Sequence, residues 1–179
     1  MAGGGLVGWR RALVATGLAA VSPMLLAVDT LTDNFATRVL AAHNRERDSL
    51  GVPRLVWSEQ LAENARAWAE HLGKVGYLAH SEDAPGDEDP EGENLWAGTR
   101  DSYSVEQMIG YWLDERKHFR PGRFPDISDT GEVEDIGHYA QMIWRTTSRI
   151  GCAIADNGRD EYLVCRYYEG GNIIGESPI

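Results

Sequence analysis

A histidine opens a short amphipathic segment in the run Gly-His-Tyr-Ala-Gln-Met-Ile-Trp, residues 137–144, beside a glycine that reads as a tight turn. The five carboxylates that precede it closely are Asp126, Asp129, Glu132, Glu134 and Asp135. This negative field favours protonation of His138 or its use as a metal ligand, because either change neutralises charge. A histidine beside aromatic residues is also often a packed core residue, so the run alone leaves both interpretations open.

The other four histidines fall into two groups. His80, like His138, lies at a loop boundary, where an imidazole is free to reach a ligand. His43 and His71 lie inside predicted helices and His118 near a helix end. Surface or capping roles suit these three residues, so His80 and His138 are the candidates for chemistry.

Two carboxylates are candidates because they border apolar segments. Glu93 precedes the pair Leu95-Trp96, and Glu115 lies one turn after Trp112. Sequence spacing does not establish that Glu93 and Glu115 meet the two histidines. The chain contains no His-Glu-x-x-His helix, no Gly-x-Ser-x-Gly turn and no phosphate-binding glycine loop, so those common catalytic classes are excluded.

Helix-capping residues and apolar periodicity predict three helices in the first part of the chain. They run from Asp33 or Asn34 to Leu50, from Ser58 to Gly73, and onward from Ser104. Acidic loops are predicted at residues 81–93 and 120–136. There is no internal repeat or second domain, and strands come late. This order predicts helices packed around a small sheet.

The two cysteines, Cys152 and Cys165, flank a turn signal and predict a β-hairpin. If they face each other, the two-residue loop is Gly158-Arg159, which suits a type II′ turn. A type I′ turn on Asn157-Gly158 would instead place Cys152 opposite Leu163. We favour the first register and predict a cross-strand disulfide, with two free buried thiols as the alternative.

Charge limits the classes of partner. The chain has 179 residues, 42% of them hydrophobic, which is enough for one domain with a real core. Its 17 basic and 28 acidic residues give a net charge of −11. Without Arg10 and Arg11, the only charged residues of segment 1–27, the net charge is −13. Nucleic acid and anionic membrane surfaces are therefore excluded as partners.

The first 27 residues are typical of an export signal. Arg10 and Arg11 precede the apolar stretch Ala12 to Val28, which is short for a spanning helix and contains Pro23. We predict a signal peptide at 1–27, with an uncleaved N-terminal anchor as the alternative, and a domain at 33–179. The expected location is secreted and extracellular, or periplasmic in a bacterium, without stable membrane embedding once the signal is removed.

Several segments together resemble the CAP superfamily of cysteine-rich secretory proteins, antigen 5 and class 1 plant pathogenesis-related proteins. The matching segments occur in the family's order. They are His43-Asn44-x-x-Arg47, Leu55-x-Trp57, Ala79-His80-Ser81, Gly92-Glu93-Asn94-Leu95, Trp112-x-x-Glu115, and residues 137–145, 162–168 and 170–172. They cover residues 35–175, and such a collinear set is specific. The chain departs from secreted eukaryotic members in having cysteines for only one disulfide.

The resemblance implies an α+β fold, a three-layer α-β-α sandwich with a mainly antiparallel central sheet. It also implies that His80, Glu93, Glu115 and His138 converge in one open cleft. In some members the two histidines bind a divalent cation, usually discussed as zinc, with the glutamates nearby. Imidazole nitrogens suit zinc, and carboxylates orient the ligands.

The fold does not settle the function. The expectation that the resemblance favours is a secreted binding module, which holds a cation and a small-molecule or lipid ligand. Residues 95–111 are apolar enough to line a ligand pocket, and equally suited to the core. The alternative is a metal-assisted, protease-like hydrolase with Glu93 or Glu115 as general base. A purely structural hydrogen-bond network of the four residues is the third possibility, and a metal-free glycosidase the most remote.

Overall fold

The computed structural model describes residues 1, 4, 23–82 and 91–179, and the side chains of its first helix from Asn34 onward. In chain order its elements are α1 (Pro23–Leu50), β1 (Val56–Trp57), α2 (Glu59–Val75), β2 (Gly92–Thr99), α3 (Val105–Asp114), η1 (Glu115–His118), η2 (Val133–Asp135), α4 (Gly137–Ile143), β3 (Arg149–Asp156) and β4 (Asp160–Tyr168).

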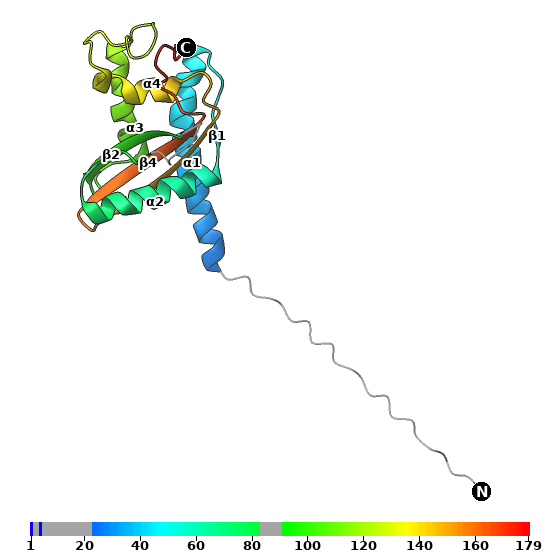
Figure 1. The fold of residues 1–179 in the computed structure, drawn as a ribbon. Coiled ribbons are helices and arrows are strands. Elements are labelled where there is room, and N and C mark those ends of the chain that lie inside the picture. Colours follow the sequence, from blue (N-terminus) through cyan, green and yellow to red (C-terminus); the bar gives the residue numbers. More distant parts are fainter. Residues whose placement is uncertain (2–3, 5–22, 83–90) are drawn as a thin grey trace.

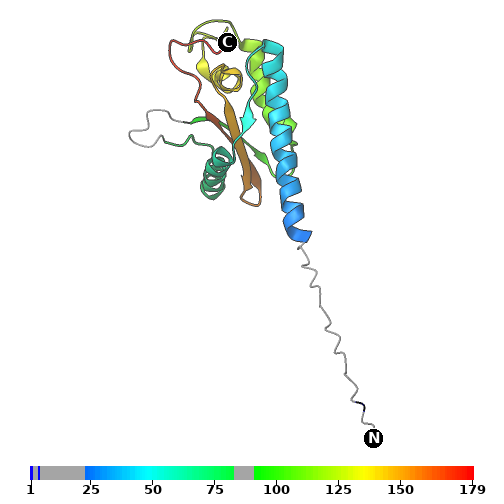
Figure 2. The same ribbon diagram turned by 90° about the vertical axis from the view of Figure 1, so that its right-hand side faces the viewer.

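The central sheet has the strand order β1-β3-β4-β2. Strands β2, β4 and β3 are antiparallel, whereas the short edge strand β1 runs parallel to β3. Helix α2 covers one face, and α1, α3 and α4 lie on the other (Figures 1 and 2). The predicted three-layer α+β sandwich is confirmed, and its one parallel edge makes the mainly antiparallel sheet a mixed one.

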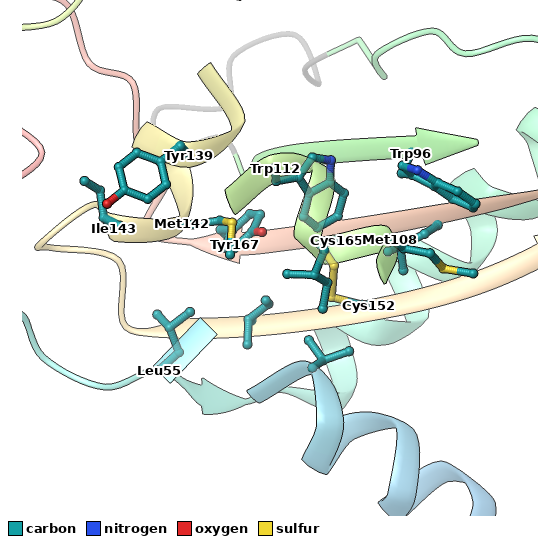
Figure 3. Close-up of a cluster of buried hydrophobic side chains, with 14 of the residues drawn as sticks. Leu55, Trp96, Met108, Trp112, Tyr139, Met142, Ile143, Cys152, Cys165 and Tyr167 are labelled. Carbon is teal, nitrogen blue, oxygen red and sulfur yellow. A yellow bond between two sulfur atoms is a disulfide. The ribbon is translucent and has the colours of Figure 1, made fainter. Parts of the chain in front are cut away.

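Two hydrophobic clusters fill the spaces between the layers. The larger cluster lies between the sheet and helices α1, α3 and α4, and includes Trp112, Met142 and Tyr167 (Figure 3). The smaller cluster lies under α2, where Ala65 and Ala69 are fully buried. Small side chains at helical spacing let the α2 backbone approach the sheet closely, which is why this layer packs tightly.

Two predicted helix boundaries are wrong. Helix α1 begins at Pro23 and continues through Asp33 and Asn34, because the preceding Met, Leu and Ala residues are strong helix formers. Helix α2 begins as predicted, with the Ser58 side chain accepting from the Leu61 N–H, but it does not end at Gly73. It ends at Val75, and Gly76 takes the left-handed C-cap position with φ of 80°.

The hairpin has the predicted register. Cys152 pairs with Cys165 across β3 and β4, and the two form a disulfide. Gly158 has φ of 90°, as the first central residue of a type II′ turn requires, and the N–H of Asn157 donates to the Asp160 carbonyl. The alternative type I′ register is thereby ruled out.

Strand β2 is an element that helical periodicity could not reveal. It places Trp96 in the core, where Met108 and Ile109 of α3 join it. These three residues of segment 95–111 are therefore core residues, as one of the two interpretations of that segment expected. The third helix has the predicted start, with Ser104 and Gln107 forming a reciprocal capping box.

The predicted export signal falls largely on residues 2–3 and 5–22, which lie outside the described part of the chain. Most of the first acidic loop, residues 83–90, also lies outside it. The second acidic loop is anchored by two fully buried residues, Ile127 and Ile136. Among the described helices, none combines the length and apolar character needed to cross a bilayer.

Candidate functional site

His138 is the second residue of α4 and forms a pair with Glu115. Its Nδ1 atom lies 2.5 Å from Glu115 Oε1, and the other carboxylate oxygen accepts the Tyr139 backbone N–H at 3.0 Å. The imidazole lies nearly parallel to the Trp112 ring, at 13° and 6.1 Å between centroids. Glu115 and the Trp112 ring therefore hold the His138 imidazole, while one-third of the side chain stays exposed to solvent.

His80 forms the second pair, with Glu93 of β2. Its Nδ1 lies 2.7 Å from Glu93 Oε1, which also accepts the Ser81 backbone N–H at 3.1 Å. Arg166, opposite Glu93 in the β2–β4 register, places a guanidinium nitrogen 2.9 Å from Glu93 Oε2. This contact is an ion pair rather than a directed hydrogen bond, since no N–H points at Oε2. The hydrogen bond to Glu93 raises the pKa of His80 above its ordinary value.

The two pairs lie at the same end of β2. Asn94, next in the chain after Glu93, donates from Nδ2 to the His138 carbonyl at 3.1 Å. The structure thus brings each predicted histidine together with one predicted glutamate and links the pairs through β2. Within the described residues, no three His, Cys, Asp or Glu side chains group closely enough to hold a metal ion. The arrangement is two histidine–carboxylate pairs rather than one three-ligand cluster.

A chain of buried hydrogen bonds leads from His43 to the backbone carbonyl of His138. His43 is fully buried, with Nδ1 2.9 Å from the Val39 carbonyl and Nε2 3.0 Å from the Tyr167 hydroxyl. A carbonyl only accepts, so Nδ1 carries the proton and Nε2 accepts from Tyr167. The Tyr167 oxygen in turn accepts from Asn94, which holds the His138 carbonyl.

The surface or capping role expected of His43 is therefore wrong. Val39, His43 and Arg47 recur every four residues, so they lie on one face of α1, and all three are fully buried. That spacing was the available signal. It was weak because histidine and arginine are usually exposed, and only their buried hydrogen-bond partners make this burial tolerable.

We expect His43 to make the protein sensitive to mild acid. Burial lowers the pKa of His43 from 6.5 to about 4. Below pH 6.5, His43 is therefore protonated in the unfolded chain but stays neutral in the folded one. The free energy of unfolding falls as the pH falls toward 4. The free energy of unfolding from urea titrations should drop by about 2 kcal/mol between pH 7 and pH 5 on this account.

His43→Gln should flatten that pH dependence, whereas His71→Gln, at an exposed position on α2, should leave it unchanged. Equal pH slopes for the wild type and His43→Gln would show that His43 does not cause the acid sensitivity.

The acidic run before His138 does not supply its carboxylate partner. Asp129 lies 2.9 Å from the Nδ1 of His118 and also pairs with Arg120, while Glu115 contacts His138. Glu115 follows α3 directly in η1, so the packing of α3 against α4 selects it. Gly137 also differs from the prediction, because it opens α4 instead of forming a tight turn.

The sequence comparisons agree on one family. A model described as the cysteine-rich secretory protein family, CAP, matches residues 40–167. Pathogenesis-related protein 1C of Nicotiana tabacum is 33% identical over 140 residues, covering 78% of this chain and 77% of that protein. Protein PRY2 of Saccharomyces cerevisiae is 32% identical over 146 residues, covering 80% of this chain and 40% of that protein.

Solved structures share the architecture. BmVAL-1 is similar with a TM-score of 0.60 and 25% identity, over 80% of this chain and 81% of that one. NaASP2, in a structure with Zn2+, has a TM-score of 0.64 and 21% identity, over 80% of this chain and 84% of that one. These likenesses support the three-layer fold described above.

Proposed function

Because the chain belongs to the CAP family of cysteine-rich secretory proteins, we propose that it is an extracellular binding protein whose His80 and His138 hold a divalent cation, zinc in the first place. The observation that carries this proposal is the partner of each Nδ1 atom. In both pairs that partner is a glutamate carboxylate.

A carboxylate only accepts, so each Nδ1 carries a proton, and in the neutral imidazole the lone pair is then on Nε2. Neutral imidazole with an Nδ1–H···carboxylate bond is the form in which histidine commonly binds zinc. Arg166 and the Ser81 N–H hold Glu93, and the Tyr139 N–H holds Glu115. Both carboxylates are therefore fixed, and they orient the imidazoles.

The donor set fits a weakly held cation. Two imidazole nitrogens suit zinc, but a stable closed site uses four protein ligands and a catalytic one three. The described residues contain no third ligand in such a group. A bound cation would supply Lewis acidity at the surface, with its remaining positions open to water or to a ligand. We therefore propose exchangeable binding rather than a permanent metal centre.

Thermal unfolding of the metal-stripped full chain, with and without zinc, tests this proposal. Zinc at a hundredfold excess over its Kd should stabilise the fold by about 2.7 kcal/mol, a rise in Tm of about 5–10 °C. His80→Ala/His138→Ala should lose the rise, and the control His71→Ala/His118→Ala should keep it. No zinc-dependent shift in the wild type, or an equal shift in the site variant, would rule out the proposed site.

The hydrolase alternative is less well supported. A general base needs a carboxylate free to take a proton from water. Glu93 and Glu115 each contact an imidazole and accept a backbone N–H, and Glu93 also pairs with Arg166. Turnover of a peptide substrate that requires zinc and disappears in His138→Ala would favour the hydrolase over the binding protein.

A small apolar or lipid ligand is the second part of the proposal. A hollow of about 460 Å³ lies where α1, α2 and β3 meet. Its apolar lining includes Phe35, Trp57 and Ile154, and Arg66 is one of the charged residues beside them. Such a lining suits an amphipathic ligand. Binding of a fluorescent fatty acid that survives chelation but not Phe35→Asp would support this site, and binding unchanged by Phe35→Asp would exclude it.

A further inference from the structure

A hollow of about 340 Å³ lies on the surface of α3, and none of its lining residues belongs to the two histidine pairs. Tyr103, Gln107, Gly110, Tyr111 and Asp114 line it. The last four recur at the three- and four-residue spacing of one helix face, and Tyr103 precedes the helix. This face of α3 points away from the core, which takes Val105, Met108, Ile109 and Trp112.

Gly110 lines the hollow and weakens the helix in which it lies. Glycine in a helix interior is about 1 kcal/mol less favourable than alanine. A Cβ atom at Gly110 would meet no other atom within 4 Å, and its φ is not positive, so neither crowding nor backbone conformation requires glycine. A glycine that weakens its helix without a packing or conformational reason is typical of a functional position. The missing side chain leaves open space in a hollow that Tyr103 and Tyr111 also line.

Two tyrosines line that space, and a tryptophan packs against both of them. The Tyr103 and Tyr111 rings lie 6.2 Å apart at 68°, which makes a corner rather than a flat platform. Trp96 backs both, at 5.0 Å from Tyr103 and 6.3 Å from Tyr111, and is itself buried. Tyr111 remains 53% exposed, so part of this residue is accessible to a ligand.

The one charged residue that lines this hollow is an acid. Asp114 lies at the rim, and no ion pair joins it to another described residue. It borders a neighbouring hollow with Arg116 and Lys117, but Arg116 is paired with Glu46. The chain as a whole carries a net charge of −11, which attracts cations toward this surface.

We propose that this hollow binds an organic cation through a quaternary or methylated ammonium group. Aromatic faces set at an angle attract such a group by cation–π interaction, and a nearby carboxylate adds to the attraction. An ammonium group that carries methyls is round and weakly hydrated, which suits a corner of rings better than a flat sugar or an extended chain does. The site is independent of the cation proposed at His80 and His138.

Choline and its neutral isostere 3,3-dimethylbutan-1-ol have the same shape and differ in charge, so they separate cation recognition from apolar binding. Ligand-observed NMR titrations of the full chain, with a chelator present, should show saturable binding of choline and at least about tenfold weaker binding of the isostere. Tyr111→Leu and Asp114→Asn should each weaken choline binding about three- to tenfold.

Gly110→Leu should abolish choline binding while keeping the fold, because its side chain enters open space in a helix that leucine favours. Tyr77→Leu removes another exposed tyrosine, beyond the end of α2, and should change nothing. Equal binding of choline and the isostere would overturn the proposal, as would no binding of choline. Choline binding that Gly110→Leu and Tyr111→Leu leave intact would place the cation elsewhere and equally overturn it.

Discussion

Replacing Arg47 by alanine should destabilise the protein by about 3–5 kcal/mol. The guanidinium group is completely buried and donates to four backbone carbonyls, those of Pro53, Met142, Trp144 and Thr147, at 2.6–2.9 Å. Burial lowers the pKa of Arg47 to about 10, so it is still charged at neutral pH. Alanine would leave a cavity and four carbonyls without their charged donor. Urea unfolding at pH 7 measures the loss.

Two variants make the Arg47 prediction specific. Arg45→Ala, at an exposed position of the same helix, should change the free energy of unfolding by less than about 0.5 kcal/mol. Arg47→Lys keeps the charge, but a single ammonium nitrogen cannot reach carbonyls on separate segments, so an intermediate loss is expected. A loss below 1 kcal/mol for Arg47→Ala, on the order of one ordinary hydrogen bond, would contradict the proposed role.

Reducing the Cys152–Cys165 disulfide should lower the free energy of unfolding by about 3 kcal/mol. The bond joins residues 13 apart across β3 and β4, and both cysteines are buried. In the loop-entropy model, closing a loop of this length restricts the unfolded chain by that amount. Reduction removes the cross-link but leaves the side chains in the core, so no cavity term is added. Urea midpoints with and without reductant measure the effect.

The double variant Cys152→Ala/Cys165→Ala is the control for the disulfide prediction. Its urea midpoint should not respond to reductant, although it should unfold more easily than the oxidised wild type. If thiol titration shows complete reduction of the wild type and its midpoint does not move, the cross-link does not stabilise this fold.

Much of the secondary structure is readable from local sequence. Ser58 and Ser104 start their helices as predicted, because a cap depends on a few neighbouring residues. The hairpin register follows from a two-residue turn between cysteines. The predicted start of α1 and the predicted end of α2 were wrong. Helix propensity extends α1 toward its N-terminus, and Gly76 rather than Gly73 ends α2.

The sequence predicted the residues of the candidate site but not how they pair. The loop positions of His80 and His138, and the apolar segments beside Glu93 and Glu115, made these residues candidates. The family resemblance added only that the four converge. Which glutamate meets which histidine depends on α3 packing against α4 and on Glu93 occupying the second position of β2. The acidic residues just upstream of His138 were expected to surround it, but nearness in sequence did not mean nearness in space. Asp129, for example, pairs with His118.

The sequence by itself determined the family, the cysteine pairing, most helix positions and the acidic net charge. These depend on local spacing, composition and charge, which need no knowledge of distant contacts. Only the tertiary structure decided that His43 and Arg47 are buried and that Gly110 lines a hollow with Tyr103 and Tyr111. The physical reason is that burial and hydrogen bonding of a polar side chain depend on segments far away in the chain. Tyr167, for example, meets His43 across 124 residues of sequence.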